Sequence, residues 1–96
     1  MTRDQMRNRI EEIGIIPAIR VSTAADALFA AEAVCGSGIP IVEVTMTVPG
    51  ALDVISELVR SSSELVVGAG TLSGVETASR CLGAGAMFLT SPGLEI

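Results

Sequence analysis

Short apolar segments alternate with amphipathic segments along the whole chain. The apolar runs begin near Ile15, Pro40, Leu65 and Ala86, at intervals of about 25 residues or slightly less. The length of each apolar run is close to the four to eight residues typical of a buried strand. Hydrophobic side chains recur at helical spacing in the segments between them. The sequence predicts helices over residues 2–13, about 23–36, from Pro49–Gly50 to 61–63, and about 74–83.

Local signals mark the ends of these helices. Gly14 is placed to end the first helix, and Ser22 or Thr23 is placed to cap the second. Pro49 suits the first turn of the third helix, because a backbone N–H is not needed there. Ser73 is placed to cap the fourth.

Strands that alternate with helices at this period predict βαβ units and a parallel sheet. Two α/β architectures fit: a doubly wound sheet, or part of a (β/α)₈ TIM barrel. A complete barrel at this period needs about 200 residues or more, and this chain supplies four strands. We expect residues 1–96 to form one partial domain, a half-barrel of four parallel strands. Its unpaired edges imply either a truncated piece or pairing with copies of itself.

Composition narrows the classes of function. Hydrophobic residues make up 49% of the chain and charged residues 18%, so a disordered segment is excluded. The net charge is −5, all six basic residues are Arg, and there is no His. These counts argue against a nucleic-acid module and against a zinc site. No apolar run approaches the roughly 20 residues of a membrane span. Two Cys in Ala-rich stretches suggest no disulfide framework, so we expect a cytoplasmic protein.

Polar side chains recur where the predicted strands end, which is where barrels build their active sites. Glu43 lies in an otherwise apolar strand and shares a face with Ile41 and Thr45. A carboxylate there is costly unless it is partnered or used, so Glu43 is a candidate acid/base residue. The alternative is a structural ion pair with Arg20. Arg20 itself is either that partner or a clamp for a phosphate or carboxylate.

Two further segments are candidates for ligand contact. Gly68-Ala69-Gly70-Thr71 predicts a loop that lets a ligand approach the backbone, with the Thr71 hydroxyl donating; Thr71 as a helix-entry cap is the alternative. Gly68 and Gly70 suggest the start of a G-x-G-x-x-G dinucleotide motif, but Gly74 falls one position too late to complete it and no ribose-binding acid follows at the right distance. Ser91-Pro92-Gly93 has the composition of a turn.

Four segments together resemble the 2-keto-3-deoxy-6-phosphogluconate (KDPG) aldolase family, which includes the 4-hydroxy-2-oxoglutarate (KHG) aldolases. In order and in register from about residue 10 onward, they are Gly14-Ile15-Ile16-Pro17-Ala18-Ile19-Arg20, Ile41-Val42-Glu43-Val44-Thr45, Gly68-Ala69-Gly70-Thr71 and Phe88-Leu89-Thr90-Ser91-Pro92-Gly93. The resemblance implies a (β/α)₈ barrel, usually a homotrimer. It also implies reversible cleavage of a 2-keto-3-deoxy sugar acid to pyruvate and an aldehyde, without a metal or organic cofactor.

The resemblance assigns roles to particular residues. A Lys of the family forms a Schiff base with the keto carbon, and the Glu that matches Glu43 shuttles protons. Residues that match Arg20, Thr71 and the Ser91–Pro92 turn hold the substrate, and we place Thr45 beside them.

This chain departs from the family pattern at two points. The Schiff-base Lys of the family lies on a later strand, beyond residue 96, and this chain contains no Lys. Thr47 stands where many members carry an Arg, which is consistent with another 2-keto acid as substrate.

We therefore interpret the chain as the N-terminal half of a class I aldolase that is inactive alone and takes a small 2-keto acid when complete. One alternative is a non-catalytic half-barrel that self-associates and binds a small anion. The other is a different phosphate-binding barrel enzyme.

Overall fold

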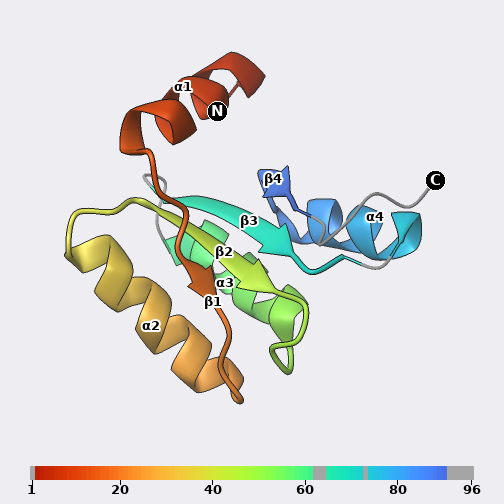
Figure 1. Ribbon diagram of the computed structural model, residues 1–96. Helices are drawn as coiled ribbons and strands as arrows, with labels where there is room; N and C mark the ends of the chain where they lie inside the picture. The colour runs from red at the N-terminus through yellow and green to blue at the C-terminus, as the bar shows by residue number, and fades with distance from the viewer. Residues whose placement is uncertain (1, 62–64, 73, 91–96) are drawn as a thin grey trace.

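The structure is a computed structural model that describes residues 2–61, 65–72 and 74–90 (Figure 1). Helices and strands alternate along the chain, as the hydrophobic pattern predicts. In chain order they are α1 (Arg3–Ile13), β1 (Ala18–Ile19), α2 (Ala24–Gly36), β2 (Ile41–Thr45), α3 (Ala51–Ser61), β3 (Val66–Gly70), α4 (Val75–Ala84) and β4 (Phe88–Leu89).

The four strands form one parallel sheet whose spatial order is the chain order, β1-β2-β3-β4. Glu43 of β2 pairs in register with Ala18 of β1 and Gly68 of β3, and Gly68 pairs with Phe88 of β4. A doubly wound sheet reverses its strand order at a switch point, whereas a barrel adds each new strand on the same side. The sequential order therefore excludes the doubly wound alternative and confirms a barrel-type α/β sheet.

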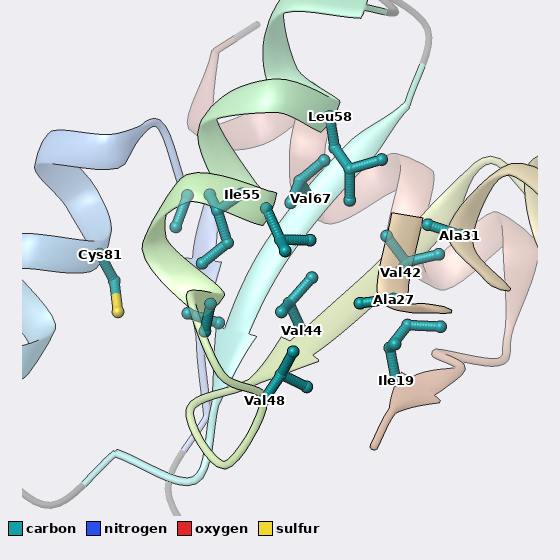
Figure 2. Packing of buried hydrophobic residues seen from close by; sticks show 14 of the residues in the cluster. Ile19, Ala27, Ala31, Val42, Val44, Val48, Ile55, Leu58, Val67 and Cys81 are labelled. Carbon is teal, nitrogen blue, oxygen red and sulfur yellow. The ribbon is translucent and has the colours of Figure 1, made fainter. Parts of the chain in front are cut away.

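The hydrophobic core lies between one face of this sheet and helices α2, α3 and α4 (Figure 2). Alternate strand residues supply its sheet side, among them Ile19, Val42, Val44, Val67 and Ala69. The helices supply small or branched side chains that are almost fully buried: Ala27, Ala31, Val54, Ile55, Leu58 and Cys81. Because these helices all pack on one face, the opposite face of the sheet is left for other contacts.

The predicted helix ends are largely confirmed. Gly14 ends α1 with a left-handed φ of 79°, and the Thr23 hydroxyl accepts a hydrogen bond from the Asp26 N–H at the start of α2. The predicted place of Pro49 in the first turn of α3 is wrong: Pro49 lies in the turn before the helix. Gly50, between Pro49 and α3, has a left-handed φ of 70°, which is not a helical conformation, so α3 begins after it. Ser73 lies outside the described residues.

The outer strands are shorter than their apolar runs predict. The run over 15–21 forms only a two-residue strand, and the run over 86–91 likewise forms only β4 within the described residues. Both strands have a described neighbour on one side only, so fewer of their residues enter the hydrogen-bonded ladder. Their ladders nevertheless extend slightly past the strand ends, since Glu43 N–H donates to the Pro17 carbonyl and Thr90 N–H to the Ala69 carbonyl, both at 2.9 Å.

Helix α1 lies apart from the other three helices (Figure 1) and none of its residues is buried. Within the described part of the chain, every helix is too short or too polar to cross a lipid bilayer.

Candidate active site

The candidate site lies on the sheet face opposite the helices. Strand side chains alternate between faces, so the residues between the core positions point to this second face. In strand order they are Ala18 and Arg20, then Ile41, Glu43 and Thr45, then Val66, Gly68 and Gly70, then Phe88 and Thr90. The polar members gather toward the carboxyl ends of the strands, as a barrel site requires.

Glu43 lies at the centre of this face and is half-buried. The Thr90 hydroxyl donates a hydrogen bond of 2.6 Å to Glu43 Oε1. Between these two groups lies Gly70, where an added Cβ would overlap the Glu43 carboxylate and come within 2.8 Å of Thr90 Oγ1. The Glu43 carboxylate therefore lies over Gly70, where any residue with a Cβ would occupy its place.

Phe88 occupies the neighbouring layer of the same face. An added Cβ at Gly68 would overlap the Phe88 ring, so the ring lies over Gly68 as the carboxylate lies over Gly70. Gly68 is the register partner of Glu43, yet the Glu43 carboxylate is found two residues further along β3. The Glu43 side chain thus leans toward the carboxyl edge of the sheet.

These positions correct one sequence-based interpretation. Gly68 and Gly70 were expected in a loop that a ligand approaches, but both lie inside β3, because Gly68 and Gly70 pair with Glu43 and Thr45. What approaches their backbone is the protein's own Phe88 ring and Glu43 carboxylate.

Arg20 and Thr71 form the second polar pair. Arg20 Nη2 donates to Thr71 Oγ1 at 3.2 Å, so the Arg20 side chain reaches from the end of β1 across β2 to the end of β3. The Thr71 hydroxyl accepts this bond, and its own hydrogen is a separate donor, so the predicted donation to a ligand stays a prediction. The φ of 60° at Thr71 is a left-handed conformation, which is costly for a β-branched residue. The structural alternative of an Arg20–Glu43 ion pair is not formed among the described residues.

Thr45 is fully buried between these pairs. Its hydroxyl donates to the Ile19 carbonyl at 3.2 Å and shares a 2.7 Å hydrogen bond with the hydroxyl of exposed Thr47. The Thr45 hydroxyl therefore joins β2 to β1 at Ile19, the residue before Arg20.

Ser91 and Pro92 lie outside the described residues. Within the described residues no cluster of three or more His, Cys, Asp or Glu could hold a metal ion. Sequence reasoning named Thr90 only as a strand-end polar group and missed its bond to Glu43. Phe88 and Thr90 share the i, i+2 spacing of Gly68 and Gly70, but the register that pairs Phe88 with Gly68 is seen only in the structure.

The arrangement combines a carboxylate held by one oxygen with a guanidinium at the same edge of the sheet. Gly70 and Thr71, adjacent in the chain, connect the two pairs. Such a site can bind an anionic group at Arg20 and move a proton at Glu43.

Comparisons with curated proteins give relatives of one kind. The chain is 33% identical over 86 residues to the 2-dehydro-3-deoxy-phosphogluconate aldolase of Treponema pallidum, covering 90% of this chain and 41% of the relative. It is 32% identical over 80 residues to the Pseudoalteromonas atlantica protein of the same name, covering 83% of this chain and 37% of the relative. The chain thus spans about two-fifths of the length of the curated relatives it matches.

Solved structures agree with these relatives. The KDPG aldolase of Zymomonas mobilis ZM4 with 3-phosphoglycerate superposes with a TM-score of 0.78 at 32% identity, covering 94% of this chain and 44% of that chain. The KDPG aldolase of Legionella pneumophila, with pyruvate captured as a covalent carbinolamine, gives 0.76 at 35% identity, covering 83% and 39%. The family model of KDPG and KHG aldolases matches residues 6–96, and by this match the chain belongs to the KDPG and KHG aldolase family.

Proposed function

We propose that these residues form part of the active site of a class I aldolase. The complete site would cleave a 2-keto-3-deoxy sugar acid, phosphorylated or not, or 4-hydroxy-2-oxoglutarate, to pyruvate and an aldehyde. The observation that carries the proposal is the Glu43 carboxylate, placed over Gly70 at the carboxyl edge of the sheet. The pyruvate carbinolamine of the Legionella relative supports the same chemistry.

The reaction needs three groups, of which this chain supplies two. An amine forms a Schiff base with the keto carbon and accepts the electron pair when the bond between C3 and C4 breaks. Because the chain has no Lys, that amine comes from outside these 96 residues. Glu43 removes the proton of the C4 hydroxyl as the aldehyde leaves, a proton is returned to C3, and water then hydrolyses the imine to release pyruvate and the free amine.

Arg20 and Thr71 supply the binding group. A substrate carboxylate or phosphate pairs with the Arg20 guanidinium, which is exposed and already turned toward the site by Thr71. Thr45 stabilises this edge of the sheet, because its hydroxyl donates a hydrogen bond to the carbonyl of Ile19, next to Arg20. Ser91 and Pro92 are proposed as further substrate contacts on the family resemblance alone.

The test is pyruvate release by the product of the complete reading frame that contains these residues. We expect cleavage of KDPG or KHG, and a loss of about 10²- to 10⁴-fold in kcat for Glu43→Gln, which keeps the shape but not the base. Glu57→Gln, on the exposed surface of α3, is the matched control and should retain activity. A complete protein that releases pyruvate from neither substrate, or a Glu43→Gln variant as fast as wild type, would refute the proposal.

We also propose, on the family resemblance, that the complete protein is a cytoplasmic homotrimer. Sedimentation equilibrium of the purified protein should give three times the subunit mass. A monomer at micromolar concentration would contradict the proposed assembly without affecting the proposed reaction.

A further inference from the structure

The bond between Thr90 and Glu43 has no role in the function described so far. Thr90 lies just beyond β4, and its N–H donates to the Ala69 carbonyl at 2.9 Å. Its side chain therefore points to the same face as Phe88, two residues earlier. Because Thr is β-branched, its hydroxyl has few positions available once the backbone is fixed.

The Gly70 backbone and the Phe88 ring also surround the Glu43 carboxylate. The Gly70 carbonyl accepts a 2.9 Å hydrogen bond from the Met46 N–H, which holds β3 in register with β2 beneath the carboxylate. The Phe88 ring fills the layer over Gly68, toward the amino ends of the strands. Glu43 has three rotatable side-chain bonds, so without a partner it would sample many positions on this face.

The hydrogen bond also distinguishes the two carboxylate oxygens. Thr90 Oγ1 donates to Oε1 at 2.6 Å, a short distance typical of a hydroxyl bound to a charged oxygen. Among the residues that the structure describes, no group donates to the second oxygen, Oε2. Within the described residues, Thr90 thus holds one carboxylate oxygen, and the other is without a protein donor.

We propose that Thr90 is a positioning residue: its hydroxyl group holds Glu43 Oε1 over Gly70 and so presents Oε2 to the substrate. The inference rests on the proposed aldolase function and adds a second residue to its acid/base step. Thr90 does not itself exchange a proton with the substrate. It acts by keeping the Glu43 carboxylate in one orientation through the reaction.

The test compares Thr90→Val with Thr90→Ser in the complete protein. Val replaces the hydroxyl by a methyl group of similar size, whereas Ser keeps the hydroxyl. We expect Thr90→Val to lower kcat for pyruvate release about 10- to 100-fold, as when one hydrogen bond to a charged group is lost. KM should stay within about two-fold, since substrate binding belongs to Arg20 and Thr71, and Thr90→Ser should restore most of kcat. Thr77→Val on α4 is the matched control.

A double-mutant cycle separates positioning from a general structural effect. In a Glu43→Gln background, Thr90→Val should cause almost no further loss, because its effect passes through the carboxylate. Thr90→Ala removes the same hydroxyl and takes the place of the Val variant should that variant fail to fold.

The failure of this inference is distinguishable from that of the proposed function. An active wild type with an unaffected Thr90→Val variant, a Ser variant as impaired as Val, or additive losses in the cycle would overturn the role of Thr90 alone. A wild type that releases no pyruvate would remove the proposed function and this role together.

Discussion

At the scale of single residues, two glycines of β3 decide what the open face of the sheet can hold. Gly68 admits the Phe88 ring and Gly70 admits the Glu43 carboxylate. Neither position has a positive φ, so the requirement is for space and not for backbone conformation. The spacing of the two glycines thereby sets the spacing of an apolar layer and a charged layer.

Gly70→Ala tests this steric requirement. The new Cβ would overlap the Glu43 carboxylate, which must then move away from Thr90. We expect a loss of about 100-fold in kcat, comparable to losing a positioned acid/base group, and a destabilisation of about 1–3 kcal/mol from overpacking. Pyruvate release and urea denaturation of the complete protein measure the two effects.

Gly83→Ala is the matched control for that substitution. Gly83 lies inside α4 with no atom within 4 Å of an added Cβ, so Ala should stabilise the helix by about 0.5–1 kcal/mol and leave activity unchanged. Equal effects of the two substitutions would contradict the role given to Gly70.

The sequence predicted which residues carry chemistry better than it predicted their partners. Glu43 was identifiable because a carboxylate interrupts an apolar strand, and Arg20 because it follows one. Their actual partners, Thr90 and Thr71, depend on strand register and on how far each side chain leans. Those quantities are set by tertiary packing, which local pattern does not contain.

At the scale of elements, α4 packs against α3 and β4 and joins the core through Cys81. Cys81 is its one fully buried residue, and the Cys81 thiol lies 3.5 Å from Met46 Sδ. Burial raises the pKa of the Cys81 thiol above that of a free thiol, because desolvation penalises the thiolate. Cys35 on α2 is half-buried by comparison.

We therefore expect iodoacetamide to alkylate Cys35 well before Cys81. The thiolate is the reacting form; burial disfavours it at Cys81, and Cys81 is also less accessible than Cys35. Mass spectrometry of digests taken over time gives the two rates, and Cys35→Ser and Cys81→Ser variants assign them. Faster labelling of Cys81 would show that α4 is not packed as described.

Element boundaries were predictable to the extent that local chemistry sets them. The Thr23 cap and the Gly14 terminus were read from residue type, and both are found. The two outer strands were overestimated, because an apolar run shows where a chain is buried and not how many of its residues find a hydrogen-bonding neighbour. Residues 15–21 illustrate this difference most clearly.

At the scale of the whole molecule, one choice lay beyond the sequence pattern. The period of strands and helices fits both a doubly wound sheet and a barrel, because each is built from the same βαβ unit. Sequential strand order, with three helices on one face, selects the barrel type. That arrangement leaves Glu43 and Arg20 on the face without helices, which in a closed barrel is the interior.

The same scale tests the proposed Schiff-base chemistry. A class I aldolase traps pyruvate on a Lys, which borohydride reduces to a stable secondary amine. With no Lys among these 96 residues, the complete protein treated with pyruvate and borohydride should carry its adduct on a Lys in another segment, on the interior face with Glu43. Peptide mapping locates the adduct, and borohydride without pyruvate is the control.

Glu43→Gln should lower turnover more than adduct formation, because Glu43 acts in the proposed proton transfers of cleavage. A complete protein that releases pyruvate yet forms no lysine adduct would contradict Schiff-base chemistry while leaving the carboxylate and guanidinium sites intact.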